Sequence, residues 1–538
     1  MAAGLAVSAP AQAADEFRTI TRDGIVLQYH RVAKTGASMK GTGVTRSDFD
    51  GDGVDDIAAV GDPFNHNLPH YPTGAVAVRY SSAAQVDYFF GAMLSDNGGS
   101  FGSAIVAGNF NGDAYDDLAV GDADEADPRN KARAGGVWII PGSSSGLVVD
   151  SAKHFNQSSP GVPGDPENLD WFGASLAAGD LNGDGRDDLA VGAYSEAIGT
   201  KAQAGAVTVL FGGADGLTAT GAQYFHQDQA AVPGAAERND QFGRTLAIGK
   251  VNGDRYADLA IGAPMENDGS SSYGTGIVTL LRGSAGGVSS TGVTAVTGAG
   301  VHGATGDRYT IAWYLGLALT IGDVNGDGLG EVIAGAPSAQ TPQLDGGLIT
   351  VFTGRTGGLS GSAVRVITQR TTGVPGDPES GDRFGAALAA GDVTGDGKAD
   401  VLVGAPGEAI GSTGEAGVVT LLKGAAGGLS GSGAQAFDQN HAVVPGSAER
   451  GDNFGARVAL LNLNGTGGLD ALVASPREEV SGDTAGYPSG TLSSFYGATG
   501  GLVPQSTSTS GLNLRSNRTL LLGYGSRIAA PESSLPLY

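Results

Sequence analysis

The chain has 538 residues, a formal net charge of −25, 93 glycines and no cysteine. The lack of cysteine excludes a disulfide framework and thiol chemistry. The acidic balance argues against a nucleic-acid-binding protein, which needs a basic face. A chain of this length can hold several domains, but the regular motifs described below indicate one large repeat domain instead.

The first residues predict secretion. Residues 2–13 resemble the apolar end of a signal peptide, and Ala11-Gln-Ala13 offers the small residues of a cleavage site. A disordered, Ala-rich leader is the alternative. No later run of 18 apolar residues suggests a membrane span. We therefore expect a signal remnant at residues 1–13 and a single extracellular domain over residues 14–538.

Residues 17–40 contain short alternating runs such as Ile25–Tyr29. This pattern predicts an outer β-strand. Because it lies ahead of the first repeat, we expect it to help close the fold.

The stretch Asp180–Asp188 has the pattern of a calcium loop. It places side-chain oxygens at positions 1, 3, 5 and 9, a glycine at position 6 and a backbone carbonyl at position 7. Ca²⁺ takes six to eight oxygen ligands in irregular geometry, so it suits this set better than Mg²⁺ does. An EF-hand is excluded because position 12 is Val191 and a short apolar run follows. The pattern predicts a calcium loop between two strands.

Versions of this loop recur every 61 to 73 residues, beginning at Asp48, Asn109, Asp180, Lys250, Asp323, Asp392 and Asn462. Together the seven loops hold 21 of the 56 acidic residues and 4 of the 31 basic ones, so the acidity mainly reflects cation ligation. Lys250 places an ammonium at position 1 of the fourth loop, where it can reach Asp254 and Asp258 and replace the ion. The seventh loop keeps one carboxylate, and we expect it to be empty.

Five loops keep a full oxygen set, which predicts about five bound Ca²⁺ ions. Their predicted ligands are Asp48, Asp50, Asp52, Val54, Asp56, Asn109, Asn111, Asp113, Tyr115, Asp117, Asp180, Asn182, Asp184, Arg186, Asp188, Asp323, Asn325, Asp327, Leu329, Glu331, Asp392, Thr394, Asp396, Lys398 and Asp400. At the seventh position of each loop the ligand is the backbone carbonyl. Asp/Gly turns without metal are the alternative.

Two further motifs accompany the loops. Phe-Gly pairs begin at Phe101, Phe172, Phe242, Phe384 and Phe454, and Gly-Ala-Pro runs begin at Gly262, Gly335 and Gly404. With these three linked motifs, residues 40–530 resemble the FG-GAP repeats of integrin α-subunit N-terminal regions. The resemblance implies an all-β, seven-bladed propeller of the integrin α type, with four antiparallel strands in each blade.

Antiparallel alternation assigns the loops to two faces. The calcium loops (between strands 1 and 2) share one face with the Gly-rich turns between strands 3 and 4. The 2–3 and 4–1 loops lie on the opposite face. The 2–3 loops differ most between repeats, and variable loops on a rigid scaffold usually carry binding.

Three places depart from the repeat. Lys40-Gly41 stands where the first blade should have Phe-Gly. Blade five has aromatics where the other blades have Asp-x-Phe-Gly. Tyr524-Gly525 copies the first strand of a blade, so this segment either closes the ring or begins an eighth, incomplete unit.

We expect the ligand face to use aromatic and histidine side chains of blades one and five, because exposed aromatics commonly anchor contacts. The candidates are His66, His70, Tyr71, His302, Tyr309, Trp313 and Tyr314. Alternatively, Trp313 and Tyr314 replace the missing core Phe of blade five.

Three strings that suggest other activities fit the repeat better. Gly142–Gly146 matches a nucleophile elbow but falls on a 3–4 turn with no helix to follow. Asp268–Ser272 has the spacing of an adhesion metal site, without room for the domain such a site needs. Arg450-Gly451-Asp452 spells a cell-attachment tripeptide, but its Asp aligns with turn residues of other repeats. Three histidines, His154, His226 and His441, fall near outer strands and are expected at the surface.

These observations favour a secreted, monomeric, non-catalytic module that binds an extracellular protein or glycan and neither binds nucleic acid nor spans a membrane. No residue is assigned as catalytic. The alternatives are a hydrolase on a propeller scaffold (an esterase, phospholipase or glycosidase, since FG-GAP repeats also accompany phospholipase domains) and a structural envelope protein.

Overall fold

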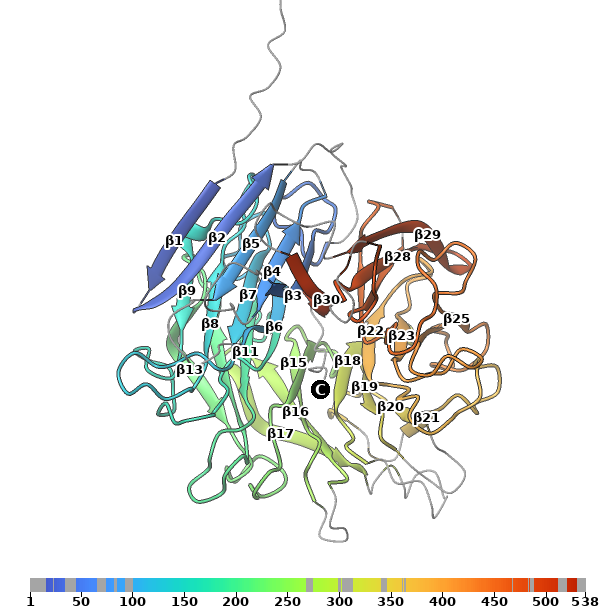
Figure 1. The fold of residues 1–538 in the computed structure, drawn as a ribbon. Coiled ribbons are helices and arrows are strands. Elements are labelled where there is room, and N and C mark those ends of the chain that lie inside the picture. Colours follow the sequence, from blue (N-terminus) through green and yellow to red (C-terminus); the bar gives the residue numbers. More distant parts are fainter. Residues whose placement is uncertain are drawn as a thin grey trace, which may run out of the picture.

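A computed structural model describes residues 16–22, 24–33, 45–64, 74–81, 85–91, 100–267, 274–298, 301, 313–339, 346–359, 361, 364–466, 468–481, 483, 488–510 and 520–529. Within these ranges the fold is nearly all β, with seven antiparallel sheets arranged in a ring (Figure 1). This confirms the seven-bladed propeller. No described helix has the length and hydrophobicity needed to cross a membrane.

Blades two to seven each contain four strands in sequence order, the first being the innermost. Blade two has β6 (Phe101–Gly108), β7 (Asp117–Asp122), β8 (Gly136–Ile140) and β9 (Lys153–Phe155), with the 3-10 helix η1 (Val149–Ser151) before β9. Blade three has β10 (Ser175–Gly179), β11 (Asp188–Ala193), β12 (Ala206–Phe211) and β13 (Thr218–Phe225). Blade four has β14 (Thr245–Gly249), β15 (Asp258–Ala263), β16 (Ile277–Ser284) and β17 (Gly287–Thr297).

The later blades repeat this plan. Blade five has β18 (Ala318–Gly322), β19 (Glu331–Ala336), β20 (Leu348–Phe352) and β21 (Val364–Ile367). Blade six has β22 (Ala387–Gly391), β23 (Asp400–Ala405), β24 (Val418–Leu422) and β25 (Gln435–Phe437). Blade seven has β26 (Arg457–Leu461), β27 (Asp470–Ser475), β28 (Thr491–Ala498) and β29 (Gly501–Ser510).

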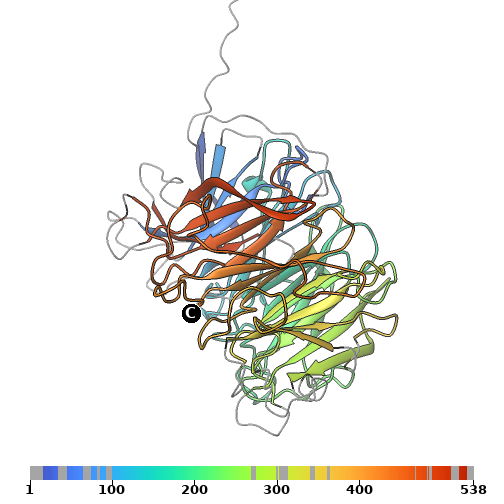
Figure 2. The ribbon, with the colours of Figure 1, turned by 90° about the vertical axis from the view of Figure 1, so that its right-hand side faces the viewer.

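Blade one is assembled from both ends of the chain. Its sheet has the order β1-β2-β5-β4-β3-β30 and combines β1 (Glu16–Arg22), β2 (Ile25–Ala33), β3 (Ile57–Phe64), β4 (Ala75–Arg79), β5 (Gln85–Gly91) and β30 (Leu520–Ile528). The C-terminal strand β30 supplies the missing innermost strand, so Tyr524-Gly525 closes the ring and does not begin an eighth unit. In both ribbon views blade seven lies beside blade one (Figures 1 and 2).

The N-terminal strands add to the outer edge of blade one, as the alternating pattern predicts: β2 pairs with β5, and β1 pairs with β2. The expectation that residues 17–40 help to close the ring is not met, because β30 closes it by pairing with β3, at the other edge of the sheet from β1 and β2. The predicted Lys40-Gly41 position lies outside the described residues.

The second strand of each blade is buried on both faces because it lies between neighbouring sheets. All six residues of β11 are buried. Small residues let the blades approach: a Cβ added at Gly192 would lie 2.3 Å from the Gly243 carbonyl oxygen of the next blade. The absence of a side chain at Gly192 therefore allows blades three and four to lie this close together.

The core consists of apolar layers between neighbouring blades. Between blades three and four, for example, Val207 and Val209 pack with Leu246, Leu259 and the Phe242 ring. An equivalent layer lies between blades seven and one, and the Ile528 side chain of β30 belongs to it. The closing strand is therefore part of the core.

Candidate metal centres and the opposite face

The third loop shows how a predicted calcium loop is shaped. Asp180 Oδ1 accepts a hydrogen bond from the Gly183 N–H at 2.6 Å, and Oδ2 accepts one from the Gly185 N–H at 3.0 Å. Both glycines have positive φ, 73° and 85°, a conformation that few other residues adopt. Asp48, Asp323 and Asp392 hold the same bonds in their loops. The loop therefore folds around the carboxylate of its own first residue.

The position-9 carboxylate joins the calcium loop to the neighbouring 3–4 turn. Asp188 accepts from the Leu181 N–H at 3.0 Å within the loop and from the Gly212 N–H at 2.9 Å in the turn. Asp56, Asp117, Asp258, Asp400 and Asp470 make the same pair of contacts. These contacts confirm that the loops and the Gly-rich turns share a face. They also give position 9 a structural role that the sequence pattern did not reveal, because it persists in loops four and seven.

Position 8 connects each blade to the one before it. Its N–H donates to the position-1 carbonyl of the preceding blade in every repeat, at 2.7–3.0 Å, as the Asp187 N–H does to the Asn109 carbonyl. In the first three blades the position-8 side chain is an Asp that also accepts from the position-1 N–H, as Asp116 does from Asp48 at 2.9 Å. The seven loops thus form a continuous hydrogen-bonded ring.

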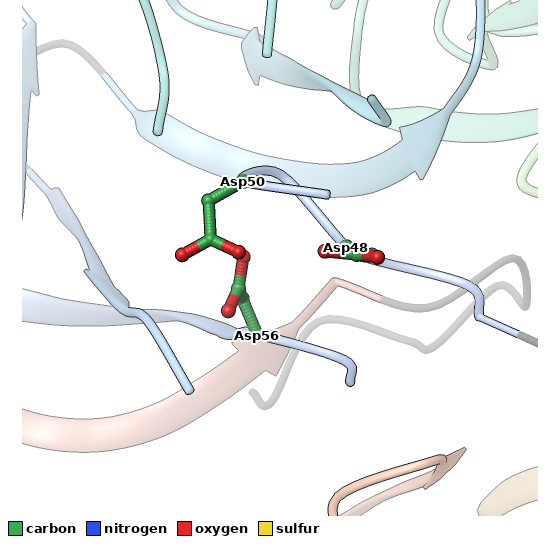
Figure 3. Close-up of side chains that lie close together, drawn as sticks. All are labelled: Asp48, Asp50 and Asp56. Carbon is green, nitrogen blue, oxygen red and sulfur yellow. The ribbon is translucent and has the colours of Figure 1, made fainter. Parts of the chain in front are cut away.

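In the first loop the carboxylates already converge. One oxygen each of Asp48, Asp50 and Asp56 lies within 4.8 Å of the others (Figure 3). Asp48 and Asp56 are buried and Asp50 is partly so. Three such carboxylates leave a concentrated negative charge, which a divalent cation would neutralise, so the residues present fit Ca²⁺. Sequence reasoning placed these three residues together, and the structure brings them together.

The raised pKa values of the loop carboxyl groups also favour a bound cation. Burial, reinforced by nearby carboxylates, raises the pKa of Asp117 and Asp188 to about 7. Burial likewise raises the pKa of Glu331 to about 7 and that of Asp56 well above its usual range. A bound cation would reverse this effect by favouring the charged form. These acids therefore gain most from an ion at neutral pH.

The fourth and seventh loops lack parts of this arrangement. Lys250 is exposed and forms no ion pair with Asp254 or Asp258, although all three residues are described, so the expected lysine replacement of the ion does not occur. The Asn252 side-chain amide instead donates to Asp258 Oδ1 at 3.1 Å. In loop seven the Asn464 amide donates to Asp470 Oδ1 at 2.8 Å. Loops three and five make the same contact through Asn182 and Asn325, so it does not distinguish the loops. What loop four lacks is the position-1 oxygen, which is replaced by the Lys250 ammonium, and loop seven lacks the carboxylates at positions 1 and 5, which are replaced by Asn462 and Thr466.

Two substitutions separate the structural role of position 9 from calcium ligation. Asp184→Ala should remove one Ca²⁺ and cost about 2–3 kcal/mol, the linkage energy plus one turn-stabilising bond to the Arg186 N–H. Asp258→Ala should leave the ion count unchanged but cost about 2–4 kcal/mol, because three N–H groups lose their acceptor. Atomic emission of the gel-filtered variants and urea unfolding measure both effects. Loss of an ion from Asp258→Ala would contradict the assignment.

On the opposite face a buried Gln–Glu pair connects adjacent blades four times. Gln157, Gln227, Gln369 and Gln439 of one blade's 4–1 loop donate at 2.6–2.7 Å to Glu196, Glu266, Glu408 and Glu478 of the next blade. In these four blades the Asp two residues before the Phe-Gly pair lies near the Glu: Asp170, Asp240, Asp382 and Asp452. Sequence reasoning missed this network, although the spacing of 39 residues between Gln and Glu repeats in the sequence.

These carboxyl pairs should make folding depend on pH. Burial, reinforced by Asp170, raises the pKa of Glu196 to about 8. The folded chain therefore holds a proton that the unfolded chain releases above about pH 4.5, so stability falls as pH rises from about 4.5 to 8 and levels off above pH 8. In excess Ca²⁺, which keeps the loops ionised, the melting temperature should fall from pH 6 to 8.5. Glu196→Gln should flatten the dependence of melting temperature on pH and stabilise the protein above pH 8 by on the order of 2–4 kcal/mol. An unchanged slope in this variant would contradict the assignment of the proton to Glu196.

Blade five resolves the two interpretations of its aromatics. Leu315 is 0% exposed, and its N–H donates to the Thr275 carbonyl as the Phe242 N–H does to that of Ala204. Leu315 therefore replaces the core Phe, and Trp313 and Tyr314 do not. Both of these aromatics are half-buried on the face opposite the predicted calcium loops, with ring centroids 6.5 Å apart. The other five ligand candidates, His66, His70, Tyr71, His302 and Tyr309, lie outside the described residues.

A second aromatic group lies on the same face at blades three and four. The Trp171 ring meets the Tyr194 ring edge-on at 5.2 Å, and the Arg244 guanidinium lies 4.7 Å from the Tyr194 ring centroid. Trp171 is half-buried and has a φ of 60°. Tyr314 has the equivalent position and φ 59° in blade five. Sequence reasoning missed this group because Trp171 lies inside an ordinary Asp-x-Phe-Gly motif.

Two of the three strings are turns of the fold. Gly142–Gly146 forms the β8–β9 turn, where the Ser143 hydroxyl donates to the Gly146 carbonyl, as Ser284 does to Gly287 in blade four. Asp452 is 3% exposed and accepts from the Glu449 N–H, so it serves the turn and is not presented for cell attachment. Residues 268–272 lie outside the described residues.

The expected surface position of the three histidines is correct for His441 only. His441 is exposed and His226 half-buried. His154 is 6% exposed, with Nε2 2.8 Å from Glu125 and the ring against Trp138. An outer strand lies at the edge of its blade, but here the 2–3 loop carrying Glu125 covers it.

Comparison with known proteins agrees with this architecture. A family model described as FG-GAP repeat matches residues 101–140, 172–210, 242–281, 315–352 and 384–422, which are blades two to six. The chain is 32% identical over 233 residues to integrin alpha pat-2 of Caenorhabditis briggsae and 31% over 232 residues to integrin alpha-PS2 of Drosophila melanogaster. It is 31% identical over 174 residues to the phosphatidylinositol-glycan-specific phospholipase D of Bos taurus.

These matches cover 42%, 42% and 32% of this chain. They cover 18%, 15% and 20% of the relatives, so the chain spans a fifth or less of their length. The blade count, the loop geometry and the five family matches lead to one conclusion: the chain is a seven-bladed β-propeller that carries FG-GAP repeats and is similar over part of its length to integrin alpha proteins.

Proposed function

We propose that this protein is a secreted, calcium-binding module that binds an extracellular protein or glycan and performs no catalysis. The observation that carries the proposal is the separation of the two faces. The calcium loops and their hydrogen-bonded ring stiffen one face, and the opposite face presents aromatic groups on loops that vary between blades. Rigid elements that support variable loops are typical of binding scaffolds. The similarity to two integrin alpha proteins supports adhesion as the context.

Ca²⁺ would be held by the five loops with full oxygen sets. In the chain itself, position 1 shapes the loop and position 9 connects it to the 3–4 turn of the same blade. Positions 3, 5 and 7 would complete the oxygen ligands. Extracellular modules bind Ca²⁺ at about 10⁻⁴–10⁻³ M, so millimolar extracellular calcium would fill such sites.

A hydrolase is the second candidate, because one relative is named as a phospholipase D. The match covers 20% of that protein. The described residues of this chain form propeller blades. The Ser144 of the elbow-like string is an exposed residue in a β-turn without a following α-helix among the described residues. The geometry therefore favours binding over hydrolysis.

The test is binding of the calcium-loaded protein to matrix-protein and glycan arrays, beside a hydrolase panel that includes glycosylphosphatidylinositol substrates. We expect binding that is lost in Trp313→Ala/Tyr314→Ala and in Trp171→Ala. A matched control is Tyr256→Ala, which changes an aromatic on the calcium-loop face. Turnover of any substrate that persists through purification controls, or binding lost only in the control variant, would contradict the proposal.

A further inference from the structure

Where two neighbouring blades meet, at a joint, the residue after the glycine of a 3–4 turn contacts the preceding blade. In blade four this residue is Val288, and the Gln223 side chain of blade three binds both of its backbone groups. Gln223 Oε1 accepts a hydrogen bond from the Val288 N–H at 2.7 Å, and Nε2 donates to the Val288 carbonyl at 3.1 Å. Gln435 of blade six likewise accepts from the Leu502 N–H of blade seven at 2.9 Å. The turn therefore presents an N–H and a carbonyl toward the preceding blade.

Two further joints satisfy the same N–H with a hydroxyl group. The Leu147 N–H of blade two donates to Tyr80 Oη at 2.9 Å, and the Leu359 N–H of blade five donates to Thr294 Oγ1 at 3.0 Å. At these four joints a neutral side chain of one blade accepts from the turn of the next. Because a buried N–H without an acceptor costs free energy, the acceptor contributes to the stability of each joint.

A cation replaces the acceptor at two other joints. Lys153 of blade two and Arg365 of blade five occupy the strand position of Gln223. Lys153 Nζ donates to the Leu217 carbonyl at 3.1 Å, and Arg365 Nη1 donates to the Leu429 carbonyl. Neither cation can accept a hydrogen bond, and no described side chain or turn carbonyl accepts from the N–H of either leucine. These two N–H groups are therefore left for an acceptor from outside the chain.

The joint between blades two and three also has room for a ligand. A cavity of about 590 Å³ lies between β9 and the start of β13, the outermost strands of these blades, and is lined by Lys153 and Leu217. Arg22, the last residue of β1, lines it as well; its Nε donates to the Ala152 carbonyl at 2.8 Å and its Nη2 to the Asp150 carbonyl at 2.6 Å. Among the described residues, neither Arg22 nor Lys153 forms an ion pair. Two half-buried cations and an N–H donor thus border one cavity, and the cations contact carbonyl oxygens alone.

We propose that this cavity binds the carboxylate of an acidic sugar. The carboxylate takes the place that the glutamine amide oxygen has at other joints: it accepts from the Leu217 N–H and from Lys153 Nζ, a charged donor. Arg22 supplies the second positive charge and has guanidinium N–H groups left after its three carbonyl contacts. The site lies at the outermost strands and is distinct from the aromatic groups of the proposed ligand face, so it does not depend on the proposed function.

The size and lining of the cavity favour a sugar over a small inorganic anion. A cavity of about 590 Å³ is larger than an isolated anion needs. The Thr218 and Thr220 hydroxyl groups and the Asp215 carboxylate also line it, and these groups form hydrogen bonds with sugar hydroxyls. Asp215 is exposed, so water and salt screen its repulsion of a bound carboxylate. Between blades five and six, Arg365 is the single cation in the described lining of a smaller cavity of about 350 Å³, so we expect weaker binding there.

The test measures binding of sodium glucuronate by isothermal titration calorimetry in excess Ca²⁺, at neutral pH and constant ionic strength. We expect a dissociation constant of about 1 mM for the wild type. Lys153→Gln should lower the affinity at least about tenfold. This variant should also melt above the wild type, because the new glutamine can pair with both backbone groups of Leu217, as Gln223 does with those of Val288. Arg365→Gln is the matched control and should bind glucuronate as the wild type does.

Equal affinity for glucuronate in Lys153→Gln and the wild type, or no binding by the wild type up to about 50 mM, would overturn the proposal. If Lys153→Gln does not fold, Arg22→Gln decides: weaker binding supports the site, and unchanged binding overturns it. Acetate bound as tightly as glucuronate would overturn the choice of a sugar, and glucose bound as tightly would overturn the choice of a carboxylate. Trp171→Ala, which tests the proposed function, should bind glucuronate as the wild type does, so either proposal can fail without the other.

Discussion

Chelating calcium should lower the melting temperature by about 8 °C. A site of about 0.1 mM affinity at about 2 mM Ca²⁺ contributes about 1.8 kcal/mol, so five sites contribute about 9 kcal/mol. An unfolding entropy of about 2 cal/mol/K per residue converts this into about 8 °C for a chain of this length. The effect is large because a domain's whole margin is about 5–15 kcal/mol.

The measurement is a calorimetric scan of the same sample with Ca²⁺, with excess EGTA, and after calcium is restored. Full recovery on restoration separates ion loss from irreversible unfolding. Adding Mg²⁺ in place of Ca²⁺ is the control, and we expect it to restore little, because Mg²⁺ demands regular octahedral geometry and keeps several waters. Identical curves in Ca²⁺ and EGTA would contradict filled calcium loops.

Removing the closing strand should have the larger effect. A variant that lacks residues 520–538 leaves the inner edge of β3 without its partner and uncovers the apolar layer to which Ile528 belongs. The lost ladder and apolar burial amount to more than about 5 kcal/mol, and an unpaired strand edge promotes aggregation. We expect this variant to lose cooperative unfolding and to aggregate at 37 °C.

A matched control removes the other end of the sheet. A variant lacking residues 1–23 loses β1, four of whose seven residues are exposed, and should melt within a few degrees of the wild type. A synthetic peptide of residues 518–530 added to the C-terminal deletion should restore a monomer, because the vacated position is complementary to that strand. A C-terminal deletion that melts like the wild type would mean that β30 does not close the ring.

The repeat period was sufficient to predict most of the fold. Seven loops at nearly constant spacing predict seven blades, and antiparallel alternation predicts which loops share a face; the Asp188–Gly212 contact bears this out. The sequence predicted less clearly how the two ends of the chain close the ring. Tyr524-Gly525 showed that a blade's first strand recurs near the C-terminus, but either pairing with blade one or an eighth unit satisfied the pattern until the partner strand β3 was known.

The candidate site residues also differ in how well the sequence predicts them. Loop ligands follow a local nine-residue pattern, so they can be predicted from sequence. Contacts between blades, such as that of Gln439 with Glu478, join residues 39 positions apart, and no local pattern marks them. The position of Leu315 also depends on three-dimensional alignment, because the repeat leads one to look for an aromatic side chain there.

The most direct test of a calcium-loaded propeller is the number and position of its ions. Anomalous diffraction from crystals grown in calcium, collected at a wavelength that enhances the calcium signal, should show five peaks. Each should lie within about 2.3–2.6 Å of the oxygens of the loops beginning at Asp48, Asn109, Asp180, Asp323 and Asp392. We expect no peak at the Lys250 or Asn462 loop. Empty loops at millimolar calcium, or peaks at those two loops instead, would contradict the account.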